Sequence, residues 1–298
     1  MVAQEKIYKF YSEDLMIRAS VAITTNVVAQ MCAIQKTFPL ASISLGRALT
    51  GALLMASQLR DGQRVGLYWN GDGPLGGIFA EANYEAQARG YCNNAQADLP
   101  LKNGKLDLSS AVGKGTLNVT RSQPFQKQPH VSIVPIATGE IGEDLAYYLM
   151  QSHQIPSIIS LAVYLDGDGS ILAAGGVLIE LMPGATENLI STLESRALQA
   201  PPLSQLLMAG KSPQDLLAVY AHTDKLVAVE HEFPITYTCR CSRDRVDRTL
   251  TLLGKATLAE MILKGEAVPV TCQFCGRSYA VSVDELRQLA TGSQSQSN

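Results

Sequence analysis

The sequence Cys239-Arg240-Cys241, followed thirty residues later by Cys272-Gln273-Phe274-Cys275, decides how the C-terminal part of this chain folds. These two pairs contain four of the six cysteines in the chain. Two close pairs separated by a loop can bring four thiolates to one tetrahedral Zn²⁺ ion. The spacing therefore predicts a zinc site that uses all four thiolates as ligands.

The region around these cysteines, residues 226–290, is predicted to form a small zinc-binding module with helices at 242–253, 257–263 and 282–289. Few large apolar side chains are available there, so the hydrophobic core of the module is thin. A structural zinc site contributes about 10–16 kcal/mol in small peptides, which is comparable to the stability of a whole domain. Loss of zinc should therefore unfold the module. The polar tail, residues 291–298, is expected to be disordered.

Four thiolate ligands leave no open coordination position, so hydrolytic zinc chemistry is not expected. Two interpretations of the metal remain: an inert structural site, or a redox switch. Each cysteine pair is close enough in sequence to form a disulfide once the metal is lost. The backbone between Cys239 and Cys241 must then bend, because an extended strand holds their Cα atoms near the limit of about 7 Å. The cysteine chemistry alone leaves both interpretations open.

A run of short helical segments, residues 184–225, precedes the module. Breaks at Pro201-Pro202 and Gly210 divide it into pieces of one to four turns. Helices of that length are not stable alone in water, so they must pack against a neighbour. The sequence therefore predicts a marginally stable linker that undocks easily.

Residues 1–183 are predicted to form one large domain in which the strands arrive as hairpin pairs, such as 64–69 with 78–83 and 158–165 with 171–181. Regular alternation of strands with helices is absent, so the fold class is α+β with mainly antiparallel strands. Helices are expected in this domain at 26–34, 42–59 and 139–153. Small residues on the second of these helices indicate that another element packs closely against it.

Two glycine-rich motifs in this domain resemble cofactor sites, but their context excludes them. Gly71, Gly73 and Gly76 have dinucleotide-binding spacing, yet a strand follows them where that fingerprint requires a helix. The acidic turn at 166–169 lacks the glycine and glutamate that a calcium loop needs at its sixth and twelfth positions. Both segments are predicted to be turns.

The remaining two cysteines, Cys32 and Cys92, are predicted to be packing thiols, since neither has a close partner in sequence.

The composition sets limits on the class of protein. The 298 residues are 46% hydrophobic and 17% charged, which excludes general disorder. The net charge of −3 excludes an overall basic surface for nucleic acid. The sequence contains no apolar run of the roughly 18 residues that a membrane span requires, and it starts without a signal peptide. Cysteines at metal-binding spacing without an export signal favour a cytoplasmic location.

Taken together, this order of domains resembles the 33 kDa chaperonin family, the bacterial redox-regulated heat-shock holdases. Besides the cysteines and the chain length, the resemblance rests on three further stretches, Gly71-Asp72-Gly73-Pro74, Ala173-Ala174-Gly175-Gly176 and Met182-Pro183, and on the continuation of the first pair as Cys239-Arg240-Cys241-Ser242-Arg243.

The resemblance implies that one Zn²⁺ is bound in the reduced, inactive protein by Cys239, Cys241, Cys272 and Cys275. Peroxide or hypochlorite, together with heat, would form the disulfides Cys239–Cys241 and Cys272–Cys275 and release the zinc. The linker would then unfold and expose a surface that holds unfolding client proteins without ATP. The resemblance also implies an active homodimer that later passes its clients to ATP-dependent chaperones. It implies no catalytic residues and no nucleic-acid or membrane partner, and it does not locate the client-binding surface.

Two other functions are compatible with the cysteine motif. A nucleic-acid-binding zinc ribbon would use basic residues of the module, namely Arg240, Arg243, Arg245 and Arg248. From residue 232 to 298, however, eight Lys and Arg stand against seven Asp and Glu, a net charge of only +1. A thiol oxidoreductase would use Cys272 and Cys275, and turnover of a disulfide substrate by the metal-free protein would reveal it.

Overall fold

The structure is a computed structural model that describes residues 5–13, 16–221 and 226–292. Contacts within the chain divide it into two compact units, Met1–Thr238 and Cys239–Asn298. The boundary predicted from the sequence, at residue 226, lies earlier than this division. The predicted linker, residues 184–225, belongs to the first unit as far as residue 221, and its last four residues lie outside the described part of the chain.

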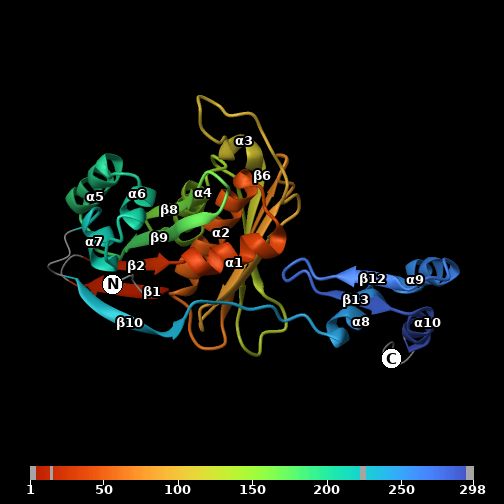
Figure 1. The fold of residues 1–298 in the computed structure, drawn as a ribbon. Helices are drawn as coiled ribbons and strands as arrows, with labels where there is room; N and C mark the ends of the chain where they lie inside the picture. The colour runs from red at the N-terminus through yellow and green to blue at the C-terminus, as the bar shows by residue number, and fades with distance from the viewer. Residues whose placement is uncertain (1–4, 14–15, 222–225, 293–298) are drawn as a thin grey trace. The chain divides into compact units, whose positions relative to one another are not determined.

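Two sheets form the frame of the first unit (Figure 1). The first has the strand order β10-β1-β2-β9-β8, with the bounds β1 Lys6–Ser12, β2 Ile17–Ile23, β8 Ser157–Leu165, β9 Ile171–Leu181 and β10 Val227–Pro234. The second has the order β11-β5-β4-β3-β6-β7, with β3 Arg64–Gly71, β4 Ile78–Asn83, β5 Gln87–Cys92, β6 Gly115–Ser122, β7 His130–Pro135 and β11 Thr236–Tyr237.

The predicted α+β class is confirmed. Neighbouring strands pair antiparallel in both sheets, apart from the parallel pairing of β11 with β5. The two predicted hairpins are present as β3–β4 and β8–β9. The acidic turn at 166–169 connects β8 to β9, as predicted: the amide of Asp166 donates to the carbonyl of Ser170 (2.9 Å).

Helices fill the space between the two sheets. They are α1 Thr25–Gln35, α2 Pro39–Ala56 and α4 Ile141–His153, and a short helix, α3 Leu108–Val112, was not predicted. Helix α2 contacts strands of both sheets and packs against α4. The predicted close approach to this helix is confirmed at Gly51, where an added Cβ would lie 2.5 Å from a methyl carbon of Leu145.

Among the described helices, α2 alone is long and apolar enough to cross a membrane by length and composition. Because 83% of that stretch is buried inside the fold, its apolar character is explained by its place in the core between the sheets.

Glycine is required where β3 turns towards β4. A Cβ added to Gly71 would lie 1.9 Å from the carbonyl oxygen of Val112, so the backbone of α3 approaches this turn too closely for any other residue. The chain continues from the turn into β4, which agrees with the rejection of a dinucleotide-binding fingerprint.

A buried carboxylate joins α4 to the six-stranded sheet. Asp144 is fully buried and accepts hydrogen bonds from the backbone amides of Ala137 (2.9 Å), Thr138 (3.0 Å) and Gly139, and from the indole nitrogen of Trp69 (3.1 Å). Burial raises the pKa of Asp144, although these hydrogen bonds oppose the rise. The side chain therefore satisfies four donors that would otherwise be buried without an acceptor.

Replacing Asp144 with alanine should destabilise the first unit by about 2–4 kcal/mol, because four donors lose their acceptor in a dry environment. The Asp144→Asn variant keeps one amide oxygen for the three backbone donors and should lose less. Urea unfolding monitored by the fluorescence of Trp69, the single tryptophan of the chain, measures both effects. Equal stability of the alanine variant and the parent protein would contradict this role.

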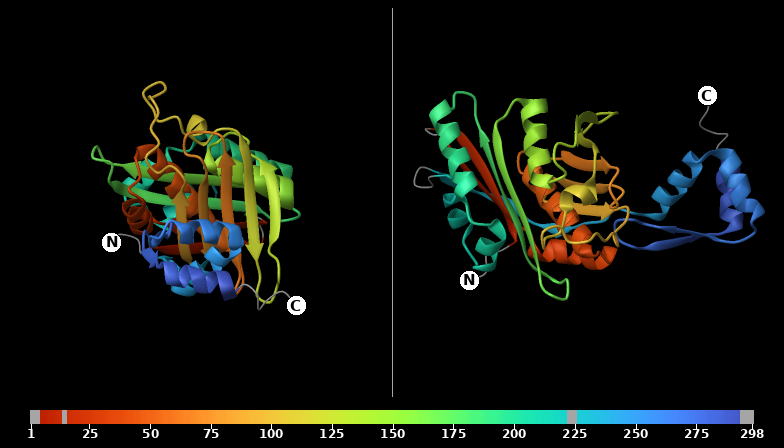
Figure 2. Two further views of the ribbon diagram at one scale, coloured as in Figure 1. Left: turned by 90° about the vertical axis from the view of Figure 1, so that its right-hand side faces the viewer. Right: turned by 90° about the horizontal axis from the view of Figure 1, so that it is seen from above.

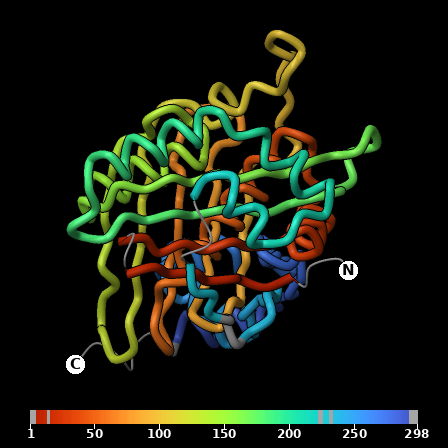
Figure 3. Tube along the Cα trace, turned by 90° about the vertical axis from the view of Figure 1, so that its left-hand side faces the viewer, coloured from red at the N-terminus to blue at the C-terminus, as the bar shows by residue number. Residues whose placement is uncertain are grey.

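The linker helices lie on the outer face of the five-stranded sheet (Figure 3). They are α5 Glu187–Gln199, α6 Leu203–Met208 and α7 Pro213–Ala218. Their buried leucines, Leu193, Leu203, Leu216 and Leu217, form a second hydrophobic cluster with the strands beneath them, separate from the core between the sheets. The helices are as short as predicted, so this packing supplies most of what keeps them folded.

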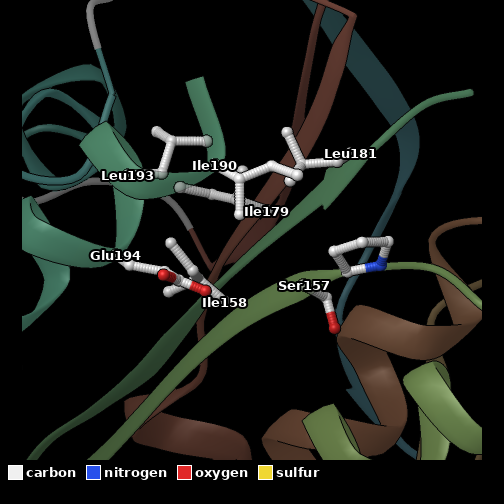
Figure 4. A pocket seen from close by; sticks show the side chains of 8 residues that line it. Ser157, Ile158, Ile179, Leu181, Ile190, Leu193 and Glu194 are labelled. Atoms are coloured by element: carbon white, nitrogen blue, oxygen red, sulfur yellow. The ribbon is translucent and has the colours of Figure 1, made fainter. Parts of the chain in front are cut away.

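The packing of α5 is incomplete. A small cavity of about 30 Å³ lies between α5 and the strands β8 and β9, and its apolar lining includes Ile158, Ile179 and Leu193 (Figure 4). The cavity is partly open to solvent, and Leu193 is the one side chain of α5 that is buried, so little apolar surface of this helix is removed from water. Helix α5 therefore contributes few buried contacts to the first unit.

The second unit consists of α8 Arg243–Leu252, α9 Gly254–Leu263, the hairpin β12 Val268–Thr271 and β13 Ser278–Val281, and α10 Val283–Gly292. The three predicted helices are confirmed, whereas the hairpin was not predicted. Five hydrophobic residues are buried in the described part of this unit, Val246, Leu250, Leu258, Val281 and Leu286, which confirms the thin core. Helix α10 includes the first two residues of the predicted tail, and residues 293–298 lie outside the described part of the chain.

Candidate metal centre

The four predicted ligands come together in the second unit. Cys239 and Cys241 directly precede α8, and Cys272 and Cys275 lie in the turn between β12 and β13. All four sulfur atoms lie within 4.8 Å of one another, with Cys239 and Cys272 separated by 3.6 Å and Cys241 and Cys275 by 3.4 Å. A tetrahedral site with Zn–S bonds of about 2.3 Å has sulfur atoms about 3.8 Å apart. The cluster therefore has the size and donor set to hold one metal ion.

The hairpin turn presents its two cysteines through local backbone hydrogen bonds. The amide of Cys272 donates to the carbonyl of Arg277 (2.9 Å), and the amide of Gly276 donates to the carbonyl of Cys272 (2.9 Å). Gly276 adopts φ 69°, a left-handed conformation that glycine accepts without steric cost. The sequence Cys-x-x-Cys-Gly thus closes the turn and directs both sulfur atoms to one side.

Without a metal, the thiols of Cys239 and Cys241 differ strongly in acidity. Burial raises the pKa of Cys239 to about 12, and its thiol neighbours add to the rise. Burial also acts to raise the pKa of Cys241, but hydrogen bonds from the Tyr279 hydroxyl (3.2 Å) and the other thiols outweigh it and lower the pKa to about 7. A negative charge is therefore stabilised first at Cys241, and a bound divalent cation would favour the ionised form of all four.

Arg243 connects α8, β13 and α10 of the second unit through hydrogen bonds. Its guanidinium group donates to Asp247 of α8 (3.1 Å), to the carbonyl of Ala280 in β13 (2.7 Å) and to Glu285 of α10 (2.8 Å). The sequence suggested Arg243 only as a nucleic-acid contact, and these three bonds instead direct its side chain into the unit. Its position one residue after the N-cap Ser242 gave no signal of these long-range partners.

The Arg243→Ala variant should destabilise the second unit by about 1–3 kcal/mol, because three charge-assisted hydrogen bonds are lost at a half-exposed site. Arg243→Lys should recover only part of this loss, since an ammonium group cannot reproduce the planar fork. The rate at which a chelator removes the metal from each variant measures the effect. Arg287→Ala is the control: it removes only an exposed pair with Asp284, and a rate change as large as that of Arg243→Ala would contradict the prediction.

The other two cysteines are buried in the first unit, as predicted. Burial raises the pKa of Cys92 to about 11, and its thiol donates to the carbonyl of Leu75 (3.4 Å). Burial also raises the pKa of Cys32. Both thiols are therefore poor nucleophiles and act as small packing groups.

Comparison with known proteins agrees with this architecture. The family model described as "Hsp33 protein" matches residues 5–282. The "33 kDa chaperonin" of Geobacter sulfurreducens is 38% identical over 97% of this chain and 95% of its own length, and that of Clostridium beijerinckii is 37% identical over 98% and 100%. The crystal structure of the 33 kDa chaperonin of Thermotoga maritima superimposes with a TM-score of 0.85 at 33% identity, covering 97% of this chain and 99% of that one. On sequence and on fold, the chain belongs to the Hsp33 protein family.

Proposed function

We propose that this protein is a redox-regulated, ATP-independent chaperone that holds unfolding proteins under oxidative and heat stress in the cytoplasm. The observation that carries the proposal is the convergence of four cysteine sulfur atoms in a unit with only five buried hydrophobic residues in its described part. Stability of such a unit depends on what binds the sulfur atoms. The names of the relatives support the chaperone function, and the redox switch is proposed from the resemblance to the family together with the ability of each cysteine pair to form a disulfide.

In the proposed resting state the thiolates of Cys239, Cys241, Cys272 and Cys275 hold one Zn²⁺, which four sulfur donors favour over harder cations. The bound ion would neutralise the thiolate charges and connect the segment before α8 to the β12–β13 turn. With the ligands complete, the linker helices remain packed on the five-stranded sheet and the protein is inactive.

Oxidation would break this connection. Two molecules of peroxide accept four electrons from the four thiolates and, with four protons, become four molecules of water. Two disulfides form, Cys239–Cys241 and Cys272–Cys275, and the Zn²⁺ is released because disulfide sulfur is a poor ligand. In the structure the sulfur of Cys239 also lies 3.6 Å from that of Cys272, and the sulfur of Cys241 lies 3.4 Å from that of Cys275, so drawing each disulfide to a bond of about 2.05 Å requires a rearrangement of these contacts between the pairs. That rearrangement couples oxidation to unfolding of the second unit.

Unfolding would then extend to the linker, whose helices are short and whose helix α5 buries a single side chain. Undocking exposes apolar side chains of the linker and of β2, β8 and β9, which are buried in the reduced protein. We further propose that the active form is a homodimer and that clients pass later to ATP-dependent chaperones.

The decisive experiment adds peroxide to the reduced, metal-loaded protein under mild heat. Zinc release is followed with a chromophoric chelator, and aggregation of a thermally unfolding client is followed by light scattering. Zinc release and suppression of aggregation should develop together, and a thiol reductant should reverse both. Zinc release without any effect on aggregation would refute the chaperone proposal.

A further inference from the structure

The six-stranded sheet ends in an open edge at β7. This strand pairs with β6 on one side, and no other strand among the described residues pairs with its other side (Figure 2, left, where β7 is the outer yellow-green strand). An open edge carries backbone donors and acceptors that can bind a further extended segment. The backbone groups that this edge exposes follow from the pairing of β7 with β6.

One backbone hydrogen bond shows which residues of β7 direct their backbone groups towards β6 and which direct them outward. The amide of Ile136 donates to the carbonyl of Gly115, which marks a hydrogen-bonded position of the antiparallel ladder. Such positions alternate, so Val134, Ser132 and His130 also turn their backbone groups towards β6. Val131, Ile133 and Pro135 therefore turn theirs outward. The edge offers the amides of Val131 and Ile133 and the carbonyls of all three residues.

The same two residues are apolar and exposed. Val131 is 51% and Ile133 is 63% exposed, and both lie on the sheet face that does not carry α2. Residues 128–136 include no Asp, Glu, Lys or Arg. Natural edge strands are usually protected by such charges, and here the prolines at 129 and 135 instead limit the open edge to a few residues.

We propose that β7 binds an extended, uncharged, apolar segment of an unfolding protein as an additional strand. This inference rests on the proposed chaperone function and adds a weak contact site, already exposed in the reduced protein, to the apolar surface that undocking of the linker uncovers. Backbone hydrogen bonds at this edge require an extended segment but do not depend on its side chains, so segments from unrelated clients can bind. Contact with Val131 and Ile133 adds a preference for apolar side chains, while the absence of charge avoids repelling clients of either sign.

The size of the edge argues against a second copy of this chain as its occupant. A six-residue strand is about 20 Å long. Adding one strand of that length buries a few hundred Å² in total, well below the roughly 1,200 Å² of a stable interface. The edge is suited to weak, reversible capture of a client segment.

Amide hydrogen exchange tests the proposal directly. The probe is a six-residue capped peptide of alternating valine and threonine, and the same peptide with N-methylated amides, which cannot pair on one side, is its control. In the free protein the amides of Val131 and Ile133 should exchange quickly, while those of Ser132 and Val134 are protected by β6. The probe should slow exchange at Val131 and Ile133 at least tenfold, and the methylated peptide should not.

A backbone variant tests the same edge with real clients. Ile133→Pro removes one outward backbone amide and leaves the hydrogen bonds to β6 intact. Ile133→Thr is the matched control, because threonine keeps that amide. The proline variant, after oxidation, should need several times more protein to suppress aggregation, whereas the threonine variant, which loses only the apolar contact, should need much less extra protein.

Three outcomes would overturn the proposal: no protection by the probe, full client holding by Ile133→Pro, or protection that rises with protein concentration in the absence of probe, which would mean that a second copy occupies the edge. If the parent protein suppresses no aggregation at all, the proposed chaperone function fails, and the exchange experiment still decides whether β7 binds an extended segment.

Discussion

Removal of the metal should unfold residues 239–292 and leave the core between the two sheets of the first unit folded. A structural zinc site contributes about 10–16 kcal/mol, and the second unit has too few buried side chains to replace that contribution. The first unit keeps two large hydrophobic clusters that contain none of the four ligands. Hydrogen exchange after chelation should therefore show loss of protection in α8, α10 and the β12–β13 hairpin, with β3, β4 and β6 unchanged.

The Cys272→Ser variant should reproduce this result under reducing conditions, because a serine hydroxyl is a poor replacement for a thiolate ligand. Metal affinity should fall and the second unit should lose several kcal/mol of stability. Cys92→Ser is the matched control, since it changes a buried cysteine of the first unit and should leave the metal content at one ion per chain. Persistent protection of β12 and β13 in the metal-free protein would show that the metal does not hold this unit together.

Replacing Leu193 with glutamate should release the linker without oxidation. The side chain of Leu193 is only 3% exposed and packs between α5 and the five-stranded sheet beside the small cavity. Burying a carboxylate there without a partner costs several kcal/mol, so undocking of a short helix becomes the cheaper alternative. The reduced variant should be cleaved rapidly by protease within residues 184–221 and should suppress client aggregation without peroxide.

Leu198→Glu is the control for this experiment. Leu198 lies on the same helix and is 88% exposed, so the same change of charge should affect neither cleavage nor activity. Rapid cleavage of the Leu193 variant without client holding would separate linker release from activation. In that case the proposed route from the cysteines to the client-binding surface would be wrong.

The candidate metal centre could be predicted from the sequence because its four ligands lie in two short motifs. Each pair is fixed by local geometry, and a metal ion needs only that the two pairs meet. The α+β class was predictable for a similar reason, since hairpins such as β8–β9 pair neighbouring segments. The division of the linker into short helices was predictable because Pro201-Pro202 and Gly210 interrupt it.

Long-range contacts were not predictable in this way. Strand β10 pairs with β1 across most of the chain, and Arg243 reaches Glu285 from a different helix. Asp144 of α4 accepts a hydrogen bond from Trp69 in β3, which lies 75 residues earlier in the chain. Each of these partners depends on how separate elements pack, and a single sequence carries no periodicity that identifies them.

The sequence by itself thus determined the cluster of four cysteines, the fold class and the short helices upstream, because each is encoded in the spacing of neighbouring residues. Only the tertiary structure decided which strand is left at the edge of the six-stranded sheet and which linker side chains are buried against the other sheet. In the sequence, Val131 and Ile133 are ordinary strand residues. Their exposure follows from the position of β7 as the last strand of the six-stranded sheet. Exposure is a property of the packed molecule, and local sequence does not contain it.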